Sequence, residues 1–82
     1  MKEVRMVSEK PMVYGKIIRE TKYLALIMIE VSSLDIMIDI IVDKETKAIL
    51  GVGLSRRQAF ANARDNAVDD EMLEKIEELE LA

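Results

Sequence analysis

The chain has 82 residues, half of them apolar, and a formal net charge of −4. It contains no cysteine and no histidine, which excludes a disulfide framework, thiol chemistry, a zinc ribbon and the commonest acid–base residue. The longest apolar run, Tyr23–Ile29, is too short to cross a membrane, and early charged residues interrupt any secretory signal. We therefore expect one cytoplasmic domain over residues 1–82, with no membrane partner.

The first third of the chain favours β-strands. Residues 1–9 are compatible with either a frayed strand or a short helix. Met12–Glu20 has one polar and one mixed face, which is typical of a strand, and Pro11 fits at its start. Tyr23–Val31 is apolar on both faces as a strand and is also long enough for a buried helix. Its β-branched residues at 27, 29 and 31 favour the strand.

A β-hairpin is expected next. Leu34–Asp43 alternates with period two, which indicates a half-buried strand. Asp43–Lys47 reads as a polar turn, and Ala48–Leu54 as the returning antiparallel strand. The sheet surface away from a packing helix is then expected to carry Met37, Ile41 and Ile49.

The strongest helical signal follows Leu54. Ser55 is a good N-cap, and Gln58 completes a capping box three residues later. Small and apolar residues recur at helical spacing on one side, at Ala59, Phe60, Ala63, Ala67 and Val68. The alanines predict a helix that lies close against the sheet.

An apolar seam continues beyond this helix through Met72, Ile76 and Leu79. It predicts either one long helix to about Leu79 or a second helix capped by Asp69. We expect an α+β fold: an antiparallel β-meander of three to four strands with the C-terminal helix packed on one face. The strand-rich sheet would occupy 1–54, the packing helix 55–68 and an acidic helical extension 69–82.

The charge is distributed unevenly along the chain. Residues 69–82 carry seven acidic residues and one lysine, whereas 1–68 carries eleven Lys and Arg against nine Asp and Glu. The acidic end is either a solvated helix face or a tail that folds back on the basic body. In the second case it would compete with a polyanion for Arg56 and Arg57.

The passage from the last strand into the helix resembles the C-terminal third of the double-stranded-RNA-binding domain. The matching positions are Gly51, Gly53, Ser55, Ala59, Ala63 and Ala67, with Arg56 and Arg57 in place of two lysines. Ile38–Leu54 also resembles the related N-terminal domain of the fifth small-subunit ribosomal protein. The chain departs from the family pattern at two positions. Phe60 occupies a position where the family has a basic residue, and Arg64 occupies one where the family has a small residue. Without histidine it also has no counterpart of the family's His-bearing loop.

The resemblance implies binding to the phosphate backbone of duplex RNA, which proteins recognise mainly by shape. Arg56 and Arg57 would bind phosphate oxygens above the N-terminus of the helix that Ser55 caps. Further backbone contacts are expected from Arg64, Lys47 and Lys16. The expected function is therefore that of a small nucleic-acid-binding protein that recognises RNA by shape through Ser55, Arg56, Arg57 and Arg64.

The alternative is an interaction or oligomerisation module of the same fold that does not bind RNA. An outer sheet patch or an exposed helix seam would then form a homodimer. The candidate interface residues are Met37, Ile41, Ile49, Met72, Ile76 and Leu79. The N-terminal residues or the C-terminal helix folding over this patch within one chain explain the pattern equally well.

We expect neither an enzyme nor a cofactor or metal. Ser55 has no base to activate it as a nucleophile. Asp35, Asp39 and Asp43 recur along one strand, but at four residues, or about 13 Å, per step they spread out rather than converge on a cation.

Overall fold

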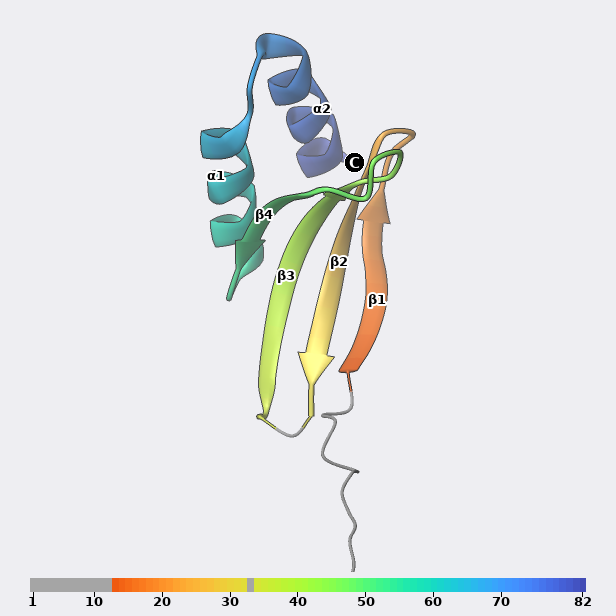
Figure 1. The fold of residues 1–82 in the computed structure, drawn as a ribbon, viewed down its shortest axis with the longest axis vertical. Helices are drawn as coiled ribbons and strands as arrows, with labels where there is room; N and C mark the ends of the chain where they lie inside the picture. Colours follow the sequence, from red (N-terminus) through yellow and green to blue (C-terminus); the bar gives the residue numbers. More distant parts are fainter. Residues whose placement is uncertain (1–12, 33) are drawn as a thin grey trace, which may run out of the picture.

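Four strands precede two helices in the computed structural model, which describes residues 13–32 and 34–82. The elements are β1 (Val13–Glu20), β2 (Leu24–Val31), β3 (Ile36–Asp43), β4 (Ile49–Gly53), α1 (Arg56–Asn66) and α2 (Asp70–Leu81) (Figure 1). This α+β arrangement confirms the fold class expected from the sequence. Residues 1–9, for which strand and helix were left open, lie outside the described residues.

The sheet is an open antiparallel meander in the order β1-β2-β3-β4. The ambiguous apolar segment is a strand, β2, which pairs with β3 along its whole length. β3 begins two residues later than predicted because Leu34 and Asp35 form the turn before it. Asp35 has a φ of 55° there, in the left-handed region that aspartate tolerates in turns.

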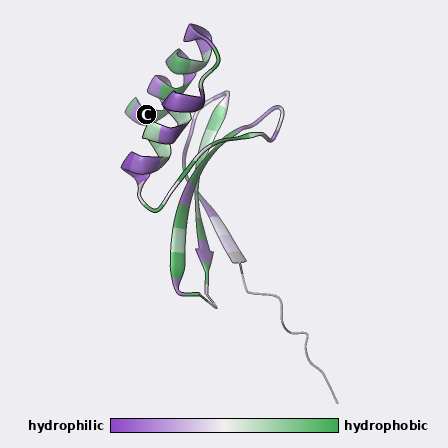
Figure 2. Ribbon diagram, turned by 60° about the vertical axis from the view of Figure 1, so that its left-hand side comes forward, coloured by the Kyte–Doolittle hydropathy of each residue, from purple (hydrophilic) through white to green (hydrophobic). Residues whose placement is uncertain are grey.

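Both helices lie on the same side of the sheet (Figure 2). They cover its upper part only, so that β1, β2 and β3 extend beyond them (Figure 1). The core lies between the helices and this part of the sheet and is aliphatic apart from one aromatic ring. It consists of Leu24, Leu26, Ile41, Ala59, Phe60, Ala63, Ile76 and Leu79.

Two glycines let α1 lie directly on β4. A Cβ built on Gly51 would lie 2.7 Å from the amide nitrogen of Ala63, and one on Gly53 would lie 2.5 Å from that of Ala59. Both alanines are fully buried. The glycines and the alanine stripe are therefore two sides of one close contact between strand and helix.

The sheet meets the helices with the side opposite to the one that we expected. Ile41 is fully buried, so its expected place on the outer surface is wrong. It lies opposite Leu26 on β2 and Gly51 on β4, and these residues share the helix-facing side. β3 alternates, but its apolar side is the far side, because Asp39 and Asp43 share the helix-facing side with Ile41. β2 is apolar on both sides apart from Glu30. The close contact at the glycines, and not the alternation of β3, fixes which side the helices cover.

α2 is a separate helix, which confirms the second of the two alternatives for the C-terminal segment. The side chain of Asp69 caps it by accepting a hydrogen bond from the amide of Met72 at 2.9 Å. Its carboxyl end is held by Arg19 on β1, which donates hydrogen bonds to the carbonyls of Leu79 (3.3 Å) and Glu80 (2.7 Å). A cation at this end is favoured by the helix dipole.

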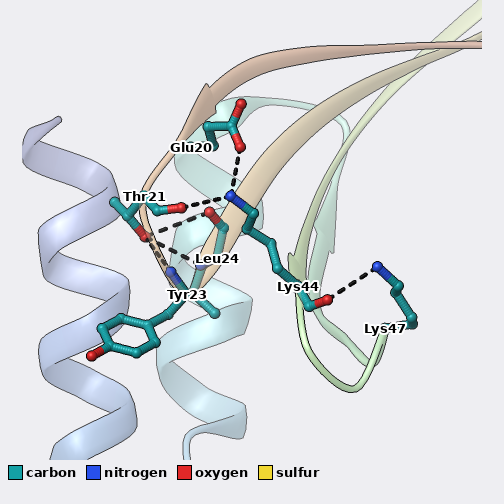
Figure 3. A network of polar contacts seen from close by, with 6 residues as sticks. All are labelled: Glu20, Thr21, Tyr23, Leu24, Lys44 and Lys47. Carbon is teal, nitrogen blue, oxygen red and sulfur yellow. Dashed lines mark hydrogen bonds and ion pairs between the residues drawn. The ribbon is translucent and has the colours of Figure 1, made fainter.

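A polar network ties together the turns at the upper end of the sheet (Figure 3). The Lys44 ammonium donates to Glu20 Oε1 (2.6 Å) and to the carbonyl of Thr21 (2.9 Å). The Thr21 hydroxyl accepts from the amides of Tyr23 and Leu24. The β1–β2 and β3–β4 turns are thereby joined side by side.

Candidate functional site

The N-terminus of α1 has the capped geometry that the sequence predicts. The Ser55 hydroxyl accepts from the Gln58 amide at 3.1 Å, and Gln58 Oε1 accepts from the Leu54 amide at 2.8 Å. Arg56 and Arg57 follow in the first turn with exposed side chains. Neither makes an ion pair within residues 13–32 and 34–82. Two cations therefore stand at the positive end of a helix dipole, an arrangement that an anion stabilises.

The other residues expected to contact RNA do not converge on this point. Arg64 makes an ion pair of 2.7 Å with Glu80 on α2. Lys47 lies in the turn at the far end of β4, and its ammonium donates to the carbonyl of Lys44. Lys16 lies on β1, at the opposite edge of the four-stranded sheet from β4. The acidic helix α2 thus engages Arg64 and not the arginine pair.

The Gly-x-Gly pair is not a phosphate-binding loop. Gly51 and Gly53 lie within β4, neither has a positive φ, and the space above each is filled by α1. Their amides therefore do not form a concave anion site. The structural role of these glycines is the close helix contact.

Most of the expected interface residues lie inside the chain's own fold. Ile41, Ile76 and Leu79 are fully buried, and Met72 packs against the core. The helix seam of Met72, Ile76 and Leu79 therefore packs within its own chain and does not form an exposed dimer interface. Met37 is half exposed but shares the helix-facing side of β3 with Ile41. Of the six expected interface residues, Ile49 alone lies on the far side of the sheet. It pairs with Val42, because a bulge at Leu50 shifts the register after the Ile41–Gly51 pair.

The far side of the sheet carries a row of apolar side chains that no described element covers. The strand register places ten β-branched residues there. We call this surface the outer face; it consists of Ile17, Ile27, Ile29, Val31, Ile36, Ile38, Ile40, Val42, Ile49 and Val52. Four of them, Ile17, Ile36, Ile49 and Val52, are exposed, and the other six are half-buried.

No helix or strand between residues 34 and 82, and none in 13–32, covers the outer face (Figure 2). Ile17 is 53% exposed, Val52 44% and Ile49 59%. The charged side chains nearest to it on this side are Glu20 and Lys44, at its upper end, and they neutralise each other at 2.6 Å. The outer face is therefore apolar and uncharged in its interior.

The free edge of β4 is closed by two asparagines of α1. Asn62 Nδ2 donates to the Val52 carbonyl at 2.6 Å, and Asn66 Nδ2 donates to the Leu50 carbonyl at 3.0 Å. The two asparagines are four residues apart, so both project from the same side of the helix. Their bonds occupy backbone acceptors that an added strand would need. The face of the sheet, and not this edge, is the surface left open.

Most of the outer face is not predicted from the sequence, because placing Met37 and Ile41 on the outer surface puts residues 36, 38, 40 and 42 on the core side. The signal that identifies the correct side is the match between Gly51 and Ala63. A strand residue without a side chain, placed opposite a small helical residue, marks the side that the helix covers. Gly51 pairs with Ile41 of β3, so the side of Gly51 identifies Ile41 as helix-facing and places Ile38 and Ile40 on the outer face.

Residues 13–32 and 34–82 include no group of three or more acidic side chains placed to hold a metal ion. No helix in those ranges has the length and apolar character needed to cross a membrane. Comparison of the chain with family models, with curated proteins and with solved structures finds no match.

Proposed function

We propose that this chain is a protein-interaction module whose binding surface is the outer face of the sheet. The single observation that supports the proposal is the row of ten β-branched apolar residues on a sheet side that no described element covers. Antiparallel sheets with one face in water normally alternate apolar and polar residues. Here β3 does alternate, but its isoleucines lie on the uncovered side and Asp39 and Asp43 lie on the helix-facing side. β2 is apolar on both sides apart from Glu30. This pattern is expected for a sheet whose uncovered side is buried when a partner binds.

The size and chemistry of the outer face suit an interface. Strands about 25 Å long and about 4.8 Å apart give a face of about 400–500 Å². Patches of this size on soluble proteins are often binding sites. Isoleucine and valine have few side-chain rotamers, so ordering them on binding loses little entropy. At about 25 cal/mol per Å², covering the face contributes about 10 kcal/mol before the losses of association.

Radical footprinting of the full chain tests whether the face is open. At high dilution we expect Ile38 and Ile40 to be labelled well above Ile76 and Leu79, which are fully buried and serve as the unlabelled reference. Val68, which is 86% exposed, serves as the labelled reference. If the outer face of a chain that light scattering shows to be a monomer stays as protected as Ile76, the chain covers this face itself, and the proposal is wrong.

Nucleic-acid binding is the second candidate, favoured by the exposed Arg56 and Arg57 beside the capped N-terminus of α1. The module would then resemble the double-stranded-RNA-binding domain in function as well as in the strand–helix passage. Against this, the other expected basic contacts lie elsewhere in the fold. Two phosphate contacts alone support only weak, salt-sensitive binding.

Duplex RNA binding at two salt concentrations separates the second candidate from the first. Phosphate binding at this site predicts that Arg56→Ala/Arg57→Ala weakens binding. It also predicts a shallower slope of log affinity against log salt concentration, by the amount that corresponds to about two lost phosphate contacts. Lys22→Ala/Lys75→Ala removes the same charge elsewhere and should leave the salt dependence nearly unchanged. Absence of binding by the unmodified chain at low salt would rule out the RNA candidate and leave the interaction module untouched.

A further inference from the structure

We infer that the partner of the outer face is a second copy of this chain, packed face to face as a two-sheet sandwich. The inference rests on the proposed function and names the partner of the same surface. The arrangement would place two sheets about 10 Å apart, with their strands aligned to within about 30°. The helices of both copies would lie on the outside, which gives four layers in the order helix, sheet, sheet, helix.

The chain's own N-terminal segment is a poor occupant of the outer face. Five of its first twelve residues are charged: Lys2, Glu3, Arg5, Glu9 and Lys10. An extended segment covers one strip about 4.8 Å wide, whereas the face is four strands wide. Most of the isoleucines would therefore remain in water.

A second copy matches the face in chemistry. Two-fold symmetric interfaces bring a patch against itself, so a charge near the axis would meet its own copy. The interior of the outer face has none, and the Glu20–Lys44 pair at its upper end is already neutralised. The face is thus compatible with its own image, whereas a charged partner would find no complementary group in its interior.

The overall negative charge does not oppose this dimer. The excess of acidic residues lies on α2, which packs on the opposite side of the sheet from the outer face. In the dimer two sheets would lie between the α2 helices, whose axes would be about 30 Å apart. That distance exceeds the screening length of about 8 Å at physiological salt.

The buried area reaches the lower range of stable interfaces. Two faces of about 500 Å² each give about 1,000 Å² in total, near the minimum for a specific interface. Aliphatic interdigitation between two twisted sheets is the packing that forms the core of β-sandwiches. We therefore expect a dimer that dissociates on dilution and not an obligate one.

Light scattering of the full chain over a dilution series tests the inference. The unmodified protein is expected to have twice the mass of one chain at high concentration. Ile38→Lys, at the centre of the outer face, should raise the dimer dissociation constant at least a hundredfold, because two lysines would be buried without partners. Met37→Lys is the matched control, because Met37 is the neighbouring residue on the other side of the same strand. This substitution should change the dimer dissociation constant less than threefold.

Single cysteines provide a second measurement that does not add charge to the sheet. Because the chain has no cysteine, one introduced thiol can form only an intermolecular disulfide. Near the two-fold axis, facing Cβ atoms approach within reach of a disulfide. We expect at least one of Ile29→Cys, Ile38→Cys and Ile40→Cys to crosslink on oxidation, and Met37→Cys not to do so.

The outcomes separate the inference from the proposed function. A dimer that Ile38→Lys dissociates, with loss of outer-face labelling as concentration rises, supports both. A monomer whose outer face stays labelled at all concentrations overturns the second copy as partner and leaves an interaction surface for another protein. A monomer with a protected face overturns both. A dimer that crosslinks only through Met37→Cys uses the other side of the sheet and overturns the inference.

Discussion

Gly51 of β4 lies directly beneath Ala63 of α1, so close that a Cβ on the glycine would stand 2.8 Å from the alanine Cβ. The same Cβ would meet the Ala63 amide nitrogen at 2.7 Å. The neighbouring atoms belong to the helix backbone, which cannot rotate away as a long side chain can. This contact fixes which side of the sheet the helices cover and, as a result, which side stays open.

Gly51→Ala is expected to lower the free energy of unfolding by about 2–3 kcal/mol, because the added methyl group forces the helix away from the strand. Urea unfolding followed by circular dichroism measures the change. Gly15→Ala is the control, since a Cβ there would lie at an ordinary 3.7 Å from Ile27 Cγ2. A stability change within about 0.5 kcal/mol is expected for the control. Equal effects of the two variants would contradict the close contact at β4.

Much of the fold follows from local sequence patterns. The strand alternation, the Ser55 cap, the alanine stripe and the acidic start at Asp69 all correspond to observed elements. These features depend on neighbours in the chain, which periodicity and capping chemistry report directly. The sheet side could not be predicted in this way, because the apolar side of β3 is the uncovered one and β2 is apolar on both sides apart from Glu30. The Arg64–Glu80 ion pair depends on how α2 turns back, which no local pattern specifies.

Arg19→Ala is expected to loosen the carboxyl end of α2. The variant removes both hydrogen bonds from the guanidinium to the carbonyls of Leu79 and Glu80. The loss should be about 1–2 kcal/mol in the free energy of unfolding, reduced from the full value of a charged hydrogen bond because the site is partly exposed to water. Amide hydrogen exchange should rise more in α2 than in α1. Uniform acceleration across both helices would argue against a local clamp.

Asp69 is expected to stabilise α2 chiefly as an N-cap and not through its charge. Asp69→Ala should lower the free energy of unfolding by about 1 kcal/mol, since it removes the acceptor for the Met72 amide. Asp69→Asn keeps an acceptor oxygen and should lose less than half as much. Thermal unfolding of the two variants side by side measures the difference. Equal losses in both would assign the effect to charge.

Asn62 and Asn66 are expected to protect the β4 edge from added strands. Asn62→Ala/Asn66→Ala frees the carbonyls of Val52 and Leu50 and should reduce stability by about 1–2 kcal/mol. The same variant should scatter light at lower temperature during heating, because an exposed strand edge pairs with other chains. Asp65→Ala, on the same helix, is the control and should aggregate no earlier than the unmodified protein.

The order of the strands has a consequence for how the protein is made. Each strand pairs with its neighbour in sequence and α1 follows β4 directly, so sheet and α1 assemble from short-range contacts and should form quickly. α2 is the exception, because its docking joins Arg19 to Glu80 across 61 residues. During synthesis Leu24 and Leu26 therefore stay uncovered until Ile76 and Leu79 have left the ribosome. In that interval the growing chain exposes apolar surface on both sides of its sheet, and we expect chaperones to bind it then.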